Sequence, residues 1–141
     1  MAFAGMNHLA VFAAAIAGWL AGAVWYTLLA EPWMRAGNRT RADIEAARKG
    51  LRGAAPFVIA FVAELIMAYV LAGAIGHLGP GQVTVRNGIV SGAILWAGFV
   101  GTTLVVNNTF GGRKPMLAVI DGGHWLLVLV VMGAVIGALG V

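Results

Sequence analysis

Four long apolar blocks divide the chain, at about residues 8–30, 55–78, 86–107 and 116–141. Each block has roughly the 20 residues that a helix needs to cross about 30 Å of hydrocarbon. The blocks are continuous and do not alternate between apolar and polar positions, as the strands of an outer-membrane barrel would. The pattern therefore predicts an all-α integral membrane protein, a four-helix bundle that forms a single membrane domain over residues 1–141.

Composition supports this class. Hydrophobic residues make up 61% of the 141 residues and charged residues 10%, whereas a soluble domain has about 45–50% and 25%. A water-soluble enzyme is nearly excluded. No phosphate-binding glycine loop, nucleophile elbow, catalytic triad or cysteine is present, so we expect no cofactor and regard an enzyme as the less favoured class.

The basic residues predict the orientation. Six of the nine lie between the first two blocks and two more, Arg113 and Lys114, lie between the last two, while Arg86 is alone on the other side. Positively charged loops stay in the cytoplasm, so we expect both termini on the non-cytoplasmic side. Because this charge is confined to membrane-flanking loops, we expect membrane lipids as partners and no nucleic acid.

The first basic loop has the pattern of a short amphipathic helix. Thr40 and Asp43 are spaced as a capping box, and Gly50 can end the segment. We expect this helix on the cytoplasmic face, although a solvated charged loop is an alternative. The other two loops are short, so the four helices should form two antiparallel hairpins. The residues expected at lipid headgroups are Arg35, Arg39, Arg41, Arg48, Lys49 and Arg52.

Three ionisable residues lie well inside the apolar blocks: Glu64, Asp121 and His124. A charge at such a depth costs at least about 2.5–3.5 kcal/mol, so these side chains should face the bundle or a wet cavity. Glu64 and His124 are each nine residues from the cytoplasmic ends of their helices and therefore lie at similar depth. The inward-facing polar pocket that we expect would comprise Glu64, Asp121, His124, Tyr26, Thr102, Thr103 and Asn107.

Two interpretations of this cluster are open. A histidine beside two carboxylates is typical of a proton-linked or ligand-binding site. The same groups would also serve as polar contacts that hold the helices together, with His124 bonded to Glu64. A divalent metal is a third, less favoured interpretation, because neither Glu-x-x-His nor His-x-x-x-His spacing occurs, and we predict no metal site.

Gly18 and Gly22 form a small-xxx-small pair on the first helix. Such a pair lets another helix approach closely, either within the bundle or across an oligomer. We expect a homo-oligomer or a place in a larger membrane complex.

Several short strings, in a characteristic order and spacing, carry a family resemblance. They are Met6-Asn7, Trp25-Tyr26, Pro32-Trp33-Met34-Arg35, Gly98-Phe99-Val100, Thr102-Thr103, Gly111-Gly112-Arg113 and Gly123-His124. The chain resembles the bacterial domain of unknown function 1761 family of small membrane proteins. The resemblance implies a four-helix, multi-pass protein of the bacterial inner membrane and supplies no activity.

Two function classes follow. The first is a small proton-linked transporter or ligand-binding protein that uses the inward-facing pocket, and the second is a structural or accessory subunit of a larger membrane complex.

Overall fold

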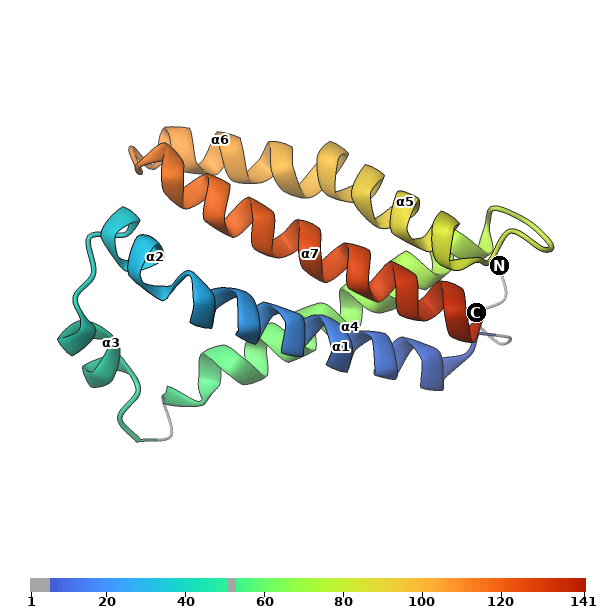
Figure 1. Cartoon of the computed structure of the whole chain (residues 1–141), viewed down its shortest axis with the longest axis horizontal. Coiled ribbons are helices and arrows are strands. Elements are labelled where there is room, and N and C mark those ends of the chain that lie inside the picture. Colours follow the sequence, from blue (N-terminus) through green and yellow to red (C-terminus); the bar gives the residue numbers. More distant parts are fainter. Residues whose placement is uncertain (1–5, 51–52) are drawn as a thin grey trace.

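The computed structural model describes residues 6–50 and 53–141, and every regular element in these ranges is a helix. Four helical spans are long and apolar enough to cross a membrane, as the sequence predicts (Figure 1). They are α1 (His8–Leu28), α4 (Ala55–Gly76), the span Val85–Phe110 and α7 (Pro115–Leu139).

The third span is interrupted. It consists of α5 (Val85–Leu95), the π-helical segment η3 (Trp96–Gly101) and α6 (Thr102–Phe110), where the sequence pattern indicates one uninterrupted helix. A π-turn adds a residue to the helical repeat and so changes which side chains face a neighbour. Here the indole N–H of Trp96 donates to the Gly122 carbonyl of α7, 2.8 Å away.

Local chemistry explains where the spans begin. The Asn7 side chain caps α1 by accepting from the Ala10 N–H, and the Thr84 hydroxyl caps α5 by accepting from the Asn87 N–H. Both α4 and α7 carry a proline in the first turn, where the missing N–H has no intrahelical partner to lose.

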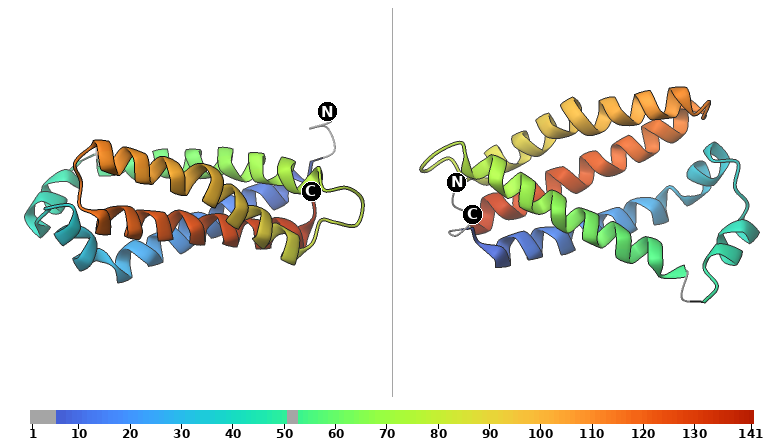
Figure 2. Two further views of the ribbon diagram at one scale, coloured as in Figure 1. Left: turned by 90° about the horizontal axis from the view of Figure 1, so that it is seen from above. Right: turned by 180° about the vertical axis from the view of Figure 1, so that it is seen from behind.

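Helix α7 is the element on which the others pack. It lies against α5 on one side and α1 on the other, and α1 also packs against α4 (Figures 1 and 2). Helix α1 begins and α7 ends at one end of the molecule, while the connection between α1 and α4 and the turn between α6 and α7 lie at the other end (Figure 1). The two basic segments therefore share one end.

Glycines bring α5 and α7 into backbone contact. A Cβ built on Gly88 would collide with the backbone of Gly133, one on Gly133 with the backbone of Gly88, and one on Gly137 with the backbone of Thr84. Only residues without a side chain permit this approach, so these glycines set the distance between the two helices.

The connection between α1 and α4 contains two short helices where the sequence predicts one. The first, α2 (Ala30–Ala36), follows directly after Leu29, and α1 itself ends at Leu28, two residues before the expected boundary at residue 30. The second, α3 (Arg41–Ala47), begins with the expected capping box of Thr40 and Asp43. Gly50, at φ +71°, follows in a left-handed conformation that suits glycine. Arg52 lies outside the described residues.

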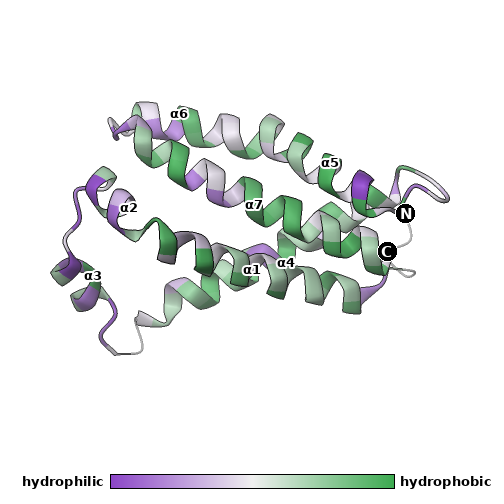
Figure 3. Cartoon of the chain, in the orientation of Figure 1, coloured by the Kyte–Doolittle hydropathy of each residue, from purple (hydrophilic) through white to green (hydrophobic). Residues whose placement is uncertain are grey.

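The outward faces of the four long spans are apolar. Large exposed side chains include Val58, Ile66, Val70 and Phe99, each at least 60% exposed. Figure 3 shows the hydrophilic residues gathered mainly in α2, α3 and the connections, with hydrophobic residues along the spans. Such a surface suits a hydrocarbon solvent rather than water.

Candidate functional site

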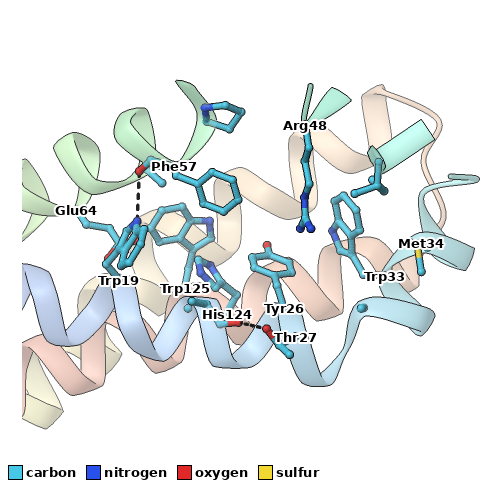
Figure 4. Close-up of a pocket in the computed structure, with 16 residues that line it drawn as sticks. Trp19, Tyr26, Thr27, Trp33, Met34, Arg48, Phe57, Glu64, His124 and Trp125 are labelled. Carbon is cyan, nitrogen blue, oxygen red and sulfur yellow. Dashed lines mark hydrogen bonds between the residues drawn. The ribbon is translucent and has the colours of Figure 1, made fainter. Parts of the chain in front are cut away.

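A pocket of about 680 Å³ lies at the end of the molecule that carries α2 and α3. Its walls come from α1, α2, α4 and α7, and from Ile44 and Arg48 of α3 and its C-terminus (Figure 4). Five aromatic side chains line it, so we call it the aromatic pocket. They are Trp19, Tyr26, Trp33, Phe57 and Trp125.

Two ionisable side chains form the buried part of the aromatic pocket. Glu64 from α4 is 2% exposed and His124 from α7 is 6% exposed, and both line the pocket. Glu64 is placed by the repeat of α4, where Pro56, Ala60 and Glu64 recur every four residues on the lining face.

The glycine pair on α1 makes room for both groups. A Cβ built on Gly18 would lie 3.2 Å from Glu64 Oε2 and 2.6 Å from Cε of Met132, and one on Gly22 would lie 2.5 Å from His124 Nε2. In this structure the pair therefore admits side chains of α4 and α7 rather than the backbone of another helix.

Polar atoms of both groups lack partners. Glu64 Oε2 and His124 Nδ1 are buried and accept or donate no hydrogen bond among the described residues. No hydrogen bond in the described ranges joins Glu64 to His124. Because buried polar atoms are normally paired, these two atoms mark a place where a ligand or water would complete the bonding.

Aromatic rings hold His124 in place. Its imidazole centroid lies 4.6 Å from that of Tyr26 and 4.8 Å from that of Trp125, the latter in an edge-to-face arrangement. The imidazole of His124 is thus packed against Tyr26 of α1 and Trp125 of its own helix.

Asp121 has a different environment from Glu64. Its Oδ1 accepts hydrogen bonds from the Tyr26 hydroxyl at 2.7 Å and from the Trp33 indole N–H at 3.2 Å. Asp121 does not line the aromatic pocket but orients two side chains that do. It therefore acts as a positioning residue.

Indole hydrogen bonds fix the helices around the pocket. The indole N–H of Trp25 in α1 donates to the Ile120 carbonyl of α7, 3.1 Å away. Trp96 of η3 donates to the Gly122 carbonyl in the same stretch of α7. Trp19 donates to the Phe57 carbonyl at 3.2 Å and so joins α1 to α4 beside the pocket.

The structure brings only some of the expected residues together. Tyr26, Glu64 and His124 line the aromatic pocket, and Asp121 is one hydrogen bond from it. Thr102, Thr103 and Asn107 do not line it: all three are exposed on α6, and the Thr102 hydroxyl donates to the Gly98 carbonyl of its own span.

Sequence reasoning missed the tryptophans that line the aromatic pocket. Trp19, Trp33 and Trp125 are typical anchors of membrane helices, but here they line the pocket. A signal was present on α1, where Trp19, Gly22 and Tyr26 recur at three- and four-residue spacing on one helical face.

The basic residues expected at headgroups have varied surroundings. Arg41 pairs with Glu31, and this guanidinium lowers the pKa of the Glu31 carboxyl. Arg48 lines the aromatic pocket, and the Lys114 ammonium donates to the Arg35 carbonyl at 2.9 Å.

The family model described as "Protein of unknown function (DUF1761)" matches residues 9–137, which is nearly the whole chain. The chain belongs to this family. Comparisons with curated proteins and with solved structures found no match. Every residue that lines the aromatic pocket of this DUF1761 chain, from Trp19 to Trp125, falls within the matched range.

Proposed function

We propose that this DUF1761 protein is a multi-pass protein of the bacterial inner membrane that binds a small ligand in the aromatic pocket and links binding to protons at Glu64 and His124. Its four spans form two antiparallel hairpins, with both termini outside the cytoplasm. The aromatic pocket then faces inward, because α2 and α3 are at the end that carries the basic loops.

One observation carries the proposal: two ionisable side chains, each more than 90% buried, line one pocket and leave polar atoms without partners. Polar contacts that merely hold helices together would be expected to satisfy one another. Ionisable groups at membrane depth are instead typical of substrate and proton pathways.

Proton linkage follows from the chemistry of the pair. A neutral imidazole and a carboxyl group without a bonded cation can each take up or release a proton when a charged ligand arrives. The two groups share the aromatic pocket, so their titrations would be coupled. The ligand-free pocket and the ligand-bound pocket would thus differ in their bound protons.

The accessory-subunit function has support from another part of the molecule. The third span is mostly exposed: of the residues in its most apolar stretch, 6% are buried. Its side chains Phe99 and Phe110 are 71% and 91% exposed. A second copy or a larger membrane protein would cover this face. This role is compatible with ligand binding because the face lies outside the aromatic pocket.

Cysteine accessibility tests the binding function directly, since the chain has no native cysteine. Ala60→Cys places a thiol on the lining of the aromatic pocket, one turn from Glu64, and Val70→Cys places one on an exposed apolar face of the same helix. In lipid nanodiscs, neutral methyl methanethiosulfonate should modify Ala60→Cys and spare Val70→Cys. The reason is that the reactive thiolate forms only where water enters.

An unreactive Ala60→Cys thiol in a folded protein would contradict the binding function. It would show that water and small molecules do not enter the aromatic pocket, and the accessory role would then be the better account.

A further inference from the structure

We propose that the aromatic pocket binds an organic cation, a molecule with a protonated amine and an apolar body, whose ammonium group lies at Glu64. This inference rests on the proposed function, because it needs a pocket that ligands enter. It adds the charge and the chemical class of the ligand.

The first support is the state of Glu64. The side chain is 2% exposed, its Oε2 has no hydrogen-bond partner, and the ion pair found in the described ranges, Arg41–Glu31, lies outside the pocket. A buried carboxylate needs a cation or several N–H donors to balance its loss of water. An alkylammonium group supplies both the charge and the donors.

The second support is the aromatic wall. Trp19, Tyr26, Phe57 and Trp125 line the pocket together with Glu64. The faces of aromatic rings attract cations, and rings that surround one carboxylate form a familiar kind of ammonium site. The same rings offer an apolar surface to the body of the ligand.

The third support is the separation of charge along the pocket. Figure 4 shows Glu64 and Trp19 at one end of the cluster and Arg48 and Trp33 toward the other. Arg48 thus faces the distal part of a ligand rather than its ammonium group. The other titratable groups around the pocket are His124 from α7 and Tyr26 from α1. Asp121, which does not line the pocket, accepts a hydrogen bond from the Tyr26 hydroxyl.

Size and donor number favour an organic cation over a metal ion. The aromatic pocket has a volume of about 680 Å³, within the roughly 300–1,000 Å³ typical of sites for small organic ligands. Its metal-ligating side chains are Glu64 and His124, whereas divalent ions take about four or more donors. One carboxylate suffices for an ammonium group.

Binding would exchange one cation for another. When a protonated amine reaches a neutral Glu64 carboxyl, the O–H bond breaks, the proton passes to water, and the carboxylate pairs with the ammonium group. The site gains one positive charge from the ammonium group and loses one with the proton, so its net charge is unchanged. This exchange is the chemical basis of the proton linkage in the proposed function.

Charge-selective modification tests this inference. The Ala60→Cys thiol is exposed in nanodiscs to two reagents of similar size, cationic 2-aminoethyl methanethiosulfonate and anionic 2-sulfonatoethyl methanethiosulfonate. The ratio of their rates is divided by the same ratio at Gln82→Cys, in an exposed connection at the opposite end of the molecule. Both reagents attack the same thiolate, so the intrinsic reactivity of the thiol cancels from the ratio of the two rates.

The inference predicts a corrected ratio of about ten or more in favour of the cation, because the cationic reagent displaces the proton of Glu64 one turn away and pairs with the resulting carboxylate, whereas the anionic reagent cannot. Glu64→Gln should bring the ratio to about one or below, because the guanidinium of Arg48 remains on the lining. The neutral reagent should still modify Ala60→Cys in this variant, which shows that the pocket remains folded and open. Arg48→Gln should keep the preference for the cation.

Other outcomes overturn the inference and leave the proposed function separate. Equal rates for the two reagents, with the neutral reagent still reacting, would show a ligand pocket without charge preference. A preference for the anion that disappears in Arg48→Gln would show an anion site. Failure of the neutral reagent as well would contradict the proposed function itself.

Discussion

Asp121 and Glu64 are both carboxylates at membrane depth, yet their surroundings give them different roles. Asp121 Oδ1 accepts from Tyr26 and Trp33, so its bonding is satisfied by the protein. Glu64 Oε2 has no protein partner. A satisfied carboxylate fixes geometry, whereas an unsatisfied one is available to a ligand.

Substitution of Asp121 should separate its acceptor role from its charge. Asp121→Asn keeps a carbonyl acceptor for both donors and should cost less than about 1 kcal/mol of stability. Asp121→Ala leaves two donors without an acceptor and should cost about 1–3 kcal/mol. Thermal unfolding in detergent checks both values. Equal losses for the two variants would show that the charge, not the hydrogen bonding, matters.

The protons of the pocket should be visible in its charge selectivity. The ratio of cationic to anionic modification at Ala60→Cys is expected to fall as the pH falls from 8 to 6, because added protons make the pocket less negative. His124→Gln keeps a hydrogen-bonding side chain and cannot titrate, so the fall should be smaller in this variant while thermal stability is retained. A stable His124→Gln protein with the unchanged pH dependence would remove His124 from the proton linkage.

At the scale of whole helices, the contact between α5 and α7 depends on glycine at each crossing point. Gly88 and Gly133 face each other with no space for a Cβ, whereas a Cβ on Gly98 of η3 would meet nothing within 4 Å. These positions form a matched pair for measuring the contact.

Gly133→Ala should force α5 away from α7 and cost about 1–3 kcal/mol, the usual penalty for overpacking a close contact. Gly98→Ala should leave stability unchanged or raise it by about 0.5–1 kcal/mol, because alanine restricts the unfolded chain. Thermal unfolding of the two variants in the same detergent measures both changes in stability. A Gly133→Ala protein as stable as the wild type would mean that the helices do not touch there.

Acid should loosen the segment that holds α2 and α3. The Arg41 guanidinium lowers the pKa of Glu31, and hydrogen bonds from the Thr40 hydroxyl and backbone lower the pKa of Asp43. Because both folded-state pKa values lie below the ordinary carboxyl value of about 4, their contribution to stability is present above that pH and is lost as the pH falls through the lowered values.

A spin label at Ala46→Cys on α3 reports this change. Its mobility should be low at pH 7 and rise as the pH approaches 3. Asp43→Ala removes the acceptor of the capping box and should raise the mobility at pH 7 already. A label equally immobile at pH 7 and pH 3 would show that neither carboxylate holds the segment.

The four spans could be predicted because hydropathy and length determine them almost alone. The capping box of α3 was also readable, since Thr40 and Asp43 act locally. Helix α2 and the π-turn at Trp96 could not, because both depend on contacts with other helices: Trp33 of α2 donates to Asp121 and Trp96 donates to Gly122. Sequence spacing contains no information about such partners.

The same limit applies to the site in the whole molecule. Counting along each helix predicts the depth of Tyr26, Glu64 and His124, and the structure has all three on one pocket. The position of a residue along a helix does not determine toward which side of the helix its side chain points. Thr102, Thr103 and Asn107 are therefore in the expected helix, but their side chains are exposed on α6. The tryptophans of the pocket depend on how α1, α4 and α7 pack, which the sequence pattern leaves open.

The overall architecture joins two features at one end of the molecule, the basic connections and the aromatic pocket. If the positive charges keep that end in the cytoplasm, a ligand reaches Glu64 from inside the cell. The direction of access is therefore the property that unites topology, pocket and function.

The most direct measurement is the sidedness of Ala60→Cys labelling by a membrane-impermeant thiol reagent. Inside-out vesicles should be labelled, whereas right-side-out vesicles should remain unlabelled until detergent is added. Val70→Cys, exposed on the apolar face of the same helix, should stay unlabelled in both preparations. Labelling of Ala60→Cys in right-side-out vesicles alone, or in neither preparation of a folded protein, would contradict an inward-facing ligand pocket.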